Sequence, residues 1–219
     1  MSDFVQQQVL SIADDFIDSH TQRSLLSLNA VSDIRYENRT LSLSITLGYP
    51  SKTVQESMSQ ALWERFEALP DVDAVNIDFG WQAPVNVTTS DQPALAKVCN
   101  IIAVASGKGG VGKSTTTVNL ALAMAAMGAK VGVLDADIYG PSIPIMFDVE
   151  NERPLAVNID GKSKMKPDEN YGVKVLSIGF FTKPDQAVVW RGPMAAKALN
   201  QMIFDAHWDT LDFLLLDLP

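Results

Sequence analysis

Residues 107–115 form a glycine-rich segment that fits the phosphate-binding loop pattern G-x-x-x-x-G-K-[ST]. Glycines let consecutive backbone N–H groups converge on an anion, because no Cβ stands in the way. A helix that begins near Lys113 adds its own unpaired N–H groups and the positive end of its dipole. We therefore predict a phosphate site made of Gly107, Lys108, Gly109, Gly110, Val111, Gly112, Lys113, Ser114 and Thr115.

Three side chains of this segment have the chemistry that a bound nucleotide such as ATP requires. Lys113 can reach the β- and γ-phosphates, the Ser114 hydroxyl is placed to ligate Mg²⁺, and Thr115 can help to hold the α-phosphate. The alternative is a glycine-rich turn that binds no ligand. An apolar run over 100–106 precedes the segment and a helical pattern follows it, and this context favours the phosphate site.

Carboxylates are expected at the ends of two further strands. Asp135 and Asp137 follow one apolar run, and Asp217 ends another. In open α/β sheets ligands bind at the carboxyl ends of the strands, so these side chains should lie beside the loop. Either Asp135 or Asp137 could orient the attacking water or a water on Mg²⁺; the alternative for each is a solvated turn cap. Asp217 has the position of the carboxylate that holds Mg²⁺ through water.

The remaining pattern of the second half predicts strands that alternate with helices, which implies a parallel sheet covered on both faces. The polar segment 149–171 is interpreted as a loop or insertion. Beside the strand and helix around the loop, we predict strands over 130–135, 173–178 and 212–217 and a helix over 193–206.

The first 80 residues form a separate pattern of the order α-β-β-α-β. Apolar residues recur every three or four positions after Ser2 and again after Ser51, whereas residues 41–47 alternate strictly between apolar and polar. Asn38-Arg39 is a plausible hairpin turn. We therefore predict an α/β protein: a small α+β domain over 1–80, a linker over 81–97 and a P-loop NTPase sheet, incomplete, over 98–219.

Composition narrows the setting and the partners. The formal charge of −9 argues against a general nucleic-acid or anionic-membrane surface. Cys99 is the single cysteine, so a reducing, cytoplasmic setting is expected, with Cys99 as a buried, inert thiol. No secretory signal and no apolar run of membrane-spanning length is visible. His20 and His207 are predicted to be surface residues rather than metal ligands.

Several segments resemble one known family. Residues 102–115 resemble the deviant phosphate loop of the MinD/ParA/nitrogenase iron protein class, for which Lys108 is the marker. Residues 135–144, 190–194 and 212–219 narrow the resemblance to the Mrp (ApbC-like) iron–sulfur cluster carrier ATPases. The N-terminal unit resembles the small domain that often precedes the ATPase in bacterial members.

This resemblance implies a homodimer in which Lys108 reaches the partner's nucleotide. Asp137 would position the hydrolytic water as the switch I carboxylate, and Asp217 would be the Walker B carboxylate. The family would carry a [4Fe-4S] cluster on Cys-x-x-Cys pairs that bridge two subunits, and pass it to apoproteins with the help of cluster-assembly factors. This chain has no such pair, so we expect a fragment whose cluster forms only in the full-length dimer. Arg191 could be a structural anchor or a sensor of nucleotide state.

Two other functions stay open at this point. One is a positioning or partition ATPase of the MinD/ParA class, which the segments around Asp137 and over 190–194 disfavour. The other is a non-catalytic adaptor, in which the N-terminal unit recruits partners and the ATPase half is inert.

Overall fold

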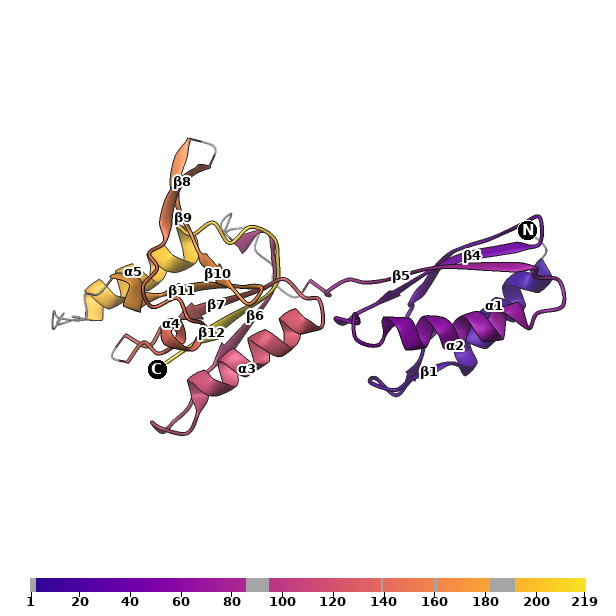
Figure 1. Cartoon of the computed structure of the whole chain (residues 1–219), viewed down its shortest axis with the longest axis horizontal. Coiled ribbons are helices and arrows are strands. Elements are labelled where there is room, and N and C mark those ends of the chain that lie inside the picture. The colour runs from indigo at the N-terminus through magenta and orange to yellow at the C-terminus, as the bar shows by residue number, and fades with distance from the viewer. Residues whose placement is uncertain (1–2, 86–94, 139, 160, 182–191) are drawn as a thin grey trace. The chain divides into compact units, whose positions relative to one another are not determined.

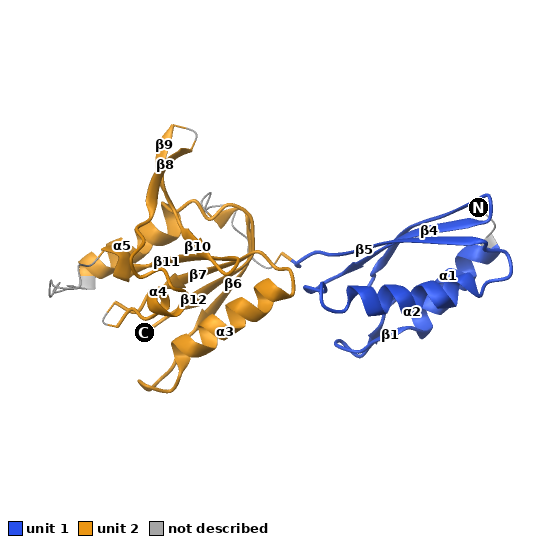
Figure 2. Ribbon diagram, in the orientation of Figure 1, with its two compact units in different colours: residues 1–84 blue, residues 85–219 orange. Residues whose placement is uncertain are grey.

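The chain divides into two compact units, Met1–Pro84 and Val85–Pro219 (Figure 2). The computed structural model describes residues 3–85, 95–138, 140–159, 161–181 and 192–219. Each unit has its own main β-sheet. Among the described helices, none combines the length and the apolar character that crossing a membrane requires.

The first unit is a three-stranded sheet with two helices, as Figure 1 shows. The strand order is β3-β4-β5, antiparallel between β3 and β4 and parallel between β4 and β5. The predicted order α-β-β-α-β is confirmed, with two short strands added after the first helix. The elements are α1 (Asp3–Asp15), β1 (Ile17–Asp18), β2 (Arg23–Ser24), β3 (Val31–Glu37), β4 (Thr40–Leu47), α2 (Gln55–Glu67) and β5 (Ala74–Trp81).

One face of β4 provides the centre of this unit's core. Its alternate residues Leu41, Leu43, Ile45 and Leu47 are all buried, and apolar residues of α1 and α2 belong to the same core cluster. The hairpin turn predicted between β3 and β4 is confirmed: Asn38 and Arg39 both have positive φ, at 49° and 62°. A two-residue turn of this kind matches the twist of the strands that it joins.

The second unit contains a five-stranded sheet of order β10-β11-β7-β12-β6. Its strands are parallel except for the short edge strand β10, so the predicted parallel α/β sheet is confirmed. Helix α3 packs against β6, β7 and β12. The elements that form or flank the sheet are β6 (Val98–Val104), α3 (Lys113–Ala126), β7 (Val131–Asp135), α4 (Ile143–Met146), β10 (Asp168–Asn170), β11 (Val173–Ser177), the 3₁₀ turn η2 (Ile178–Phe181), α5 (Gly192–Phe204) and β12 (Leu211–Asp217).

Of the two interpretations of residues 149–171, a loop or an insertion, the structure contradicts the first, a loop without regular structure. The segment contains β10 and an antiparallel hairpin of β8 (Leu155–Ile159) and β9 (Lys162–Lys166), which projects from the sheet in Figure 1. Leu155, Val157 and Ile159 of β8 lie opposite the three lysines of β9, and no residue of either strand is buried. Four of the five residues of β8 are apolar, but β9 is mostly polar and the segment as a whole is rich in charged residues, so it resembles a loop in composition.

Strand register brings the functional residues to one edge of the sheet. Asp217 at the end of β12 is level with Asp135 at the end of β7 and with Val104 at the end of β6. The glycine-rich loop begins directly after β6 and ends where α3 starts. The loop and both carboxylates therefore share the carboxyl edge of the sheet, as predicted from the order of the elements.

Candidate functional site: a phosphate-binding loop facing a buried carboxylate

The backbone of the glycine-rich loop needs glycine at two positions. Gly110 and Gly112 have φ of 73° and 89°, a region that side chains with a Cβ rarely adopt. Gly112 is also the N-cap of α3 and leaves the first N–H groups of that helix without a side-chain cap. A Cβ placed on Gly107, Gly109, Gly110 or Gly112 would meet nothing within 4 Å. The loop therefore surrounds open space into which helix N–H groups are directed.

The Asp217 carboxylate is the centre of the site's hydrogen bonds. Lys113 Nζ and Ser114 Oγ each donate to Asp217 Oδ2 at 2.7 Å. Thr117 Oγ1 donates to the other oxygen, Oδ1, also at 2.7 Å. Asp217 and Thr117 are fully buried, while 10% of the Lys113 side chain is exposed. The predicted residues Lys113, Ser114 and Asp217 thus form one ion-paired cluster at the base of the loop.

The two carboxylates after β7 have different environments. Asp137 is part of the wall of the open space, and its Oδ2 lies 3.9 Å from Lys113 Nζ. Asp135 is fully buried, where it accepts hydrogen bonds from the backbone N–H groups of Asp137 and Ile143 and from Ser177 Oγ. The idea that Asp135 could orient a reacting water is therefore wrong, because its oxygens hold the backbone that presents Asp137.

Burial also changes the charge state of Asp135. Removal from water raises the pKa of Asp135 to about 6, although its three hydrogen bonds oppose the rise. The neighbouring Asp217 carboxylate adds to the increase. Asp135 therefore titrates in a range where most aspartates are already fully ionised.

A cavity of about 420 Å³ is bounded by the loop and by the segment after β7. Lys108, Lys113, Ser114 and Thr115 line it together with Asp137. Val111, which the motif also includes, points elsewhere: it is 58% exposed and is not part of the wall. Four further residues of the wall are not among the predicted site residues, namely Ser106, Ser142, Met146 and Pro219.

Thr117 and Ser177 are the other two residues that sequence reasoning missed. Thr117 lies three positions after Ser114 on α3, so both hydroxyls occupy the same helix face, and this spacing could have identified it. Ser177 ends β11, level with Asp135, and only the strand register shows that they meet. Both residues support a carboxylate rather than line the cavity.

The other residues singled out from the sequence are not part of this cluster. Cys99 is half-buried rather than buried, and burial together with Asp212 raises the pKa of its thiol, which disfavours the reactive thiolate. His20 is exposed and His207 is half-buried. Within the described part of the chain, no three His, Cys, Asp or Glu side chains gather as metal ligands would. Trp190 and Arg191 lie outside the described residues.

Comparison with known proteins gives matches to both units. A family model described as NUBPL iron-transfer P-loop NTPase matches residues 97–219, and one described as iron-sulfur cluster assembly protein matches residues 6–79. An iron-sulfur cluster carrier protein of Synechocystis sp. is 37% identical over 96% of this chain and 60% of its own length. The carrier protein of Escherichia coli K12 is 43% identical over 90% of this chain and 53% of its own length.

Among solved structures, a nucleotide-binding protein from Archaeoglobus fulgidus in complex with ADP is 40% identical, with a TM-score of 0.47. The match covers 57% of this chain and 46% of that one. The chain spans little more than half the length of the curated relatives it matches. The family model over residues 97–219 covers more than half of the chain and confirms the family inferred from the loop and its neighbouring segments. The chain belongs to the family of NUBPL iron-transfer P-loop NTPases.

Proposed function

We propose that this chain is the ATP-binding part of an iron–sulfur cluster carrier, and that ATP binds with its phosphates in the loop over 107–115. The observation that carries the proposal is the convergence of Lys113 and Ser114 on the buried Asp217 behind an open glycine loop. The curated relatives from Synechocystis sp. and Escherichia coli, which are named as iron-sulfur cluster carrier proteins, support the cargo.

The residues at the base of the loop fit a magnesium ion. Ser114 and Asp217 provide hard oxygen donors, which Mg²⁺ prefers. Asp217 Oδ2 already binds one cation, the Lys113 ammonium group, at 2.7 Å. Ser114 would hold Mg²⁺ directly and Asp217 would hold it through water. When bound, the ion would neutralise negative charge on the phosphates.

In this proposal the carboxylates near Lys113 and the phosphates of ATP compete for its ammonium group. This group is paired with Asp217 and lies near Asp137, and the β- and γ-phosphates would draw it away from them. The backbone N–H groups of the loop would donate hydrogen bonds to the phosphate oxygens, and unlike Lys113 these donors carry no net charge. Asp137, on the cavity wall, then orients the attacking water for hydrolysis.

The dimer is a further part of the proposal. Lys108 is exposed on the cavity wall, and no hydrogen bond or ion pair of its side chain occurs among the described residues. It is therefore free to reach the nucleotide of a second subunit. In the whole protein the cluster is cargo that two subunits hold between them and pass to apoproteins.

Calorimetric titration of the chain with ATP and Mg²⁺ tests the nucleotide site. Lys113→Ala should abolish binding, because it removes the fixed positive charge for the β- and γ-phosphates. Lys166→Ala is the matched control, since Lys166 is exposed on the hairpin away from the loop. Unchanged ATP affinity in Lys113→Ala would refute the assignment of the site.

The carrier function requires an experiment with the whole protein. Loaded with a cluster, it should restore activity to the apo form of a [4Fe-4S] enzyme, and Lys113→Ala should change that transfer while Lys166→Ala should not. If the apo enzyme gains no activity from the loaded protein, the carrier function is wrong even where ATP binds normally.

A further inference from the structure

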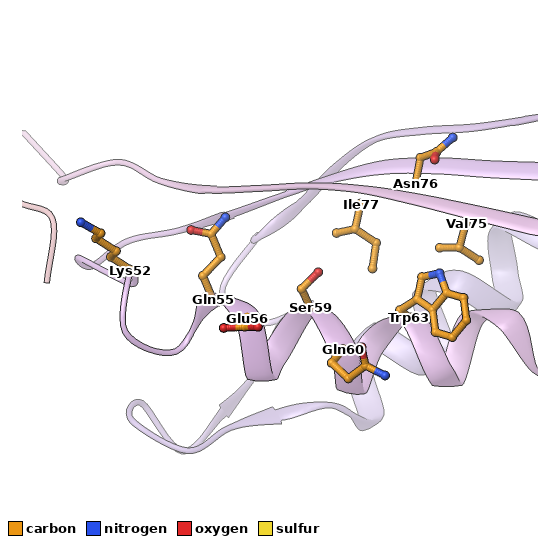
Figure 3. Close-up of a pocket in the computed structure, with 9 residues that line it drawn as sticks. All are labelled: Lys52, Gln55, Glu56, Ser59, Gln60, Trp63, Val75, Asn76 and Ile77. Carbon is orange, nitrogen blue, oxygen red and sulfur yellow. The ribbon is translucent and has the colours of Figure 1, made fainter.

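An open groove of about 720 Å³ lies between α2 and β5 in the first unit, far in sequence from the phosphate loop. Figure 3 shows that Ser59 and Trp63 of α2 stand on one side of it and Val75 and Ile77 of β5 on the other. Trp63 is 37% exposed, although its neighbours on α2, Met58, Leu62 and Phe66, are buried. A large aromatic side chain is therefore available on the wall of the groove.

The strand that borders the groove has a free edge. In the described part of the unit, β5 pairs with β4 and the sheet ends there. The N–H of Gln82 bonds to Leu47 O at the end of β4, so even-numbered residues face β4, whereas Phe79 O turns away and accepts from Gln55 Nε2. Backbone groups alternate along a parallel strand, so those of Val75 and Ile77 also point outward. These two residues line the groove as well.

The charge of the first unit indicates which occupant fits. Residues 1–84 contain twelve Asp and Glu side chains and five Lys and Arg side chains, so they carry most of the net charge of −9. Lys52 and Glu56, which have opposite charges, both line the groove, so the acidic excess comes from the rest of the unit, including Asp78 on β5 itself. Pairing of two copies edge to edge would bring two acidic units together, which their repulsion opposes. A basic segment would be attracted to the same edge.

We propose that the α2–β5 groove binds an extended, basic segment of a partner protein, which adds a strand to the free edge of β5. Backbone hydrogen bonds to Val75 and Ile77 would align the segment. Its alternate side chains would then point into the groove against Trp63, and these should be apolar. The basic side chains between them would point to the other face of the sheet, where Asp78 of β5 lies. This partner site goes beyond the proposed carrier function and requires neither nucleotide nor cluster.

The test uses the ¹⁵N-labelled full chain and a pool of decapeptides in which Lys or Arg alternates with Val, Ile, Leu or Phe. Bound peptide should shift the amide signals of Val75 and Ile77 and slow their hydrogen exchange, because their N–H groups gain acceptors. A matched pool with Glu in place of Lys and Arg should bind at least about tenfold more weakly. Peptides that are N-methylated at alternate residues should lose the same protection.

Variants of the groove complete the test. Trp63→Ala should weaken binding about tenfold or more, as loss of a central aromatic anchor does. Ser59→Arg, which places a cation on the groove wall, should weaken the basic pool as well. Phe4→Ala is the control, because Phe4 is 59% exposed on α1. The proposal would be overturned if the amides of Val75 and Ile77 gained no protection from hydrogen exchange. It would also be overturned if Trp63→Ala and Ser59→Arg both bound the basic pool as tightly as the parent chain. Concentration-dependent pairing of the Val75 and Ile77 amides without peptide would overturn it too, because it would assign the edge to a second copy.

Discussion

At the scale of single residues, the Asp217 carboxylate organises the candidate site. It is fully buried and accepts hydrogen bonds from an ammonium group and two hydroxyl groups. A buried carboxylate is stable only with such partners, because desolvation of an unpaired charge costs several kcal/mol. Ser114 and Lys113 face the cavity and are available to a ligand, whereas Thr117 holds the opposite oxygen in place.

Thr117 is therefore predicted to position Asp217. Thr117→Val keeps the shape of the side chain but leaves Asp217 Oδ1 without its donor, so the free energy of unfolding should fall by about 1–3 kcal/mol. Affinity for ATP with Mg²⁺ should fall several-fold, and Thr117→Ser should restore both properties because it returns the hydroxyl. Urea denaturation and calorimetric titration measure the two effects. Equal stability and affinity in Thr117→Val and the parent chain would contradict this role.

Asp135 predicts a dependence of stability on pH. Its pKa is raised by burial to about 6, so between about pH 4 and pH 6 the native state binds more protons at this site than the unfolded chain. The contribution of Asp135 to the free energy of unfolding therefore falls as pH rises through this range, by roughly 3 kcal/mol in total, and stays low above it.

Comparison with Asp135→Asn isolates this contribution, because asparagine does not titrate. Urea denaturation at steps from pH 4 to pH 7 should show the parent chain losing stability relative to Asp135→Asn as pH rises. A constant difference between the two proteins, or one that changes in the opposite direction, would be incompatible with a protonated Asp135 at low pH.

The sequence predicted those site residues whose location follows from a local motif or from the end of a strand. The loop motif identified Lys113 and Ser114, and an apolar strand that ends in aspartate identified Asp217, because a strand's end determines where its last side chain lies. The residue pattern alone left the same role open to Asp135 and Asp137, and only the family resemblance assigned it to Asp137. Their roles differ through the turn after β7, whose backbone N–H groups and the distant Ser177 occupy the oxygens of Asp135.

At the scale of elements, Gly132 in β7 leaves room for side chains that pack on one face of the sheet. A Cβ there would lie 2.7 Å from Leu211 Cδ1, 3.0 Å from Trp208 Cζ3 and 3.1 Å from Leu214 Cδ1. All three neighbours are buried, so they have little room to move.

Gly132→Ala should therefore destabilise the second unit by about 1–3 kcal/mol through overpacking. Gly140→Ala is the matched control, because a Cβ at Gly140 meets nothing within 4 Å and its φ is not in the left-handed region. Thermal unfolding followed by circular dichroism compares the two. An equal melting temperature for Gly132→Ala and Gly140→Ala would show that the core accommodates the added methyl group.

The prediction identified the elements with a buried face and missed the hairpin that has none. Strand β4 alternates strictly because only one of its faces is buried, whereas β7 shows no alternation before its final Asp135 because all five of its residues are buried. The hairpin of β8 and β9 has no buried face, and β9 also bonds to the backbone after α5 through Met165. The lysines of β9 resemble those of a loop, but the Asp160-Gly161 pair between the two runs is a local hairpin signal that could have identified it.

At the scale of the whole molecule, the two units differ in charge and in the chemistry that they present. The first carries most of the excess negative charge and offers a strand edge, whereas the second offers a cavity lined with phosphate-binding groups. Neither unit presents a cluster of thiolates, because the chain contains Cys99 alone. The chain spans little more than half the length of the curated relatives it matches, and Cys99 is the single thiol that it could offer to an iron–sulfur cluster.

Residues 1–219 are accordingly predicted to bind ATP without holding a [4Fe-4S] cluster. Such a cluster needs about four thiolate ligands, and two copies of this chain supply only two, each half-buried and with a raised pKa. After anaerobic reconstitution with iron and sulfide and removal of excess reagents, the chain should retain iron at background level and lack the brown cluster absorption. Cys99→Ser, treated in parallel, should give the same result. Stable retention of about four iron ions per two chains, lost in Cys99→Ser, would mean that Cys99 is a cluster ligand after all.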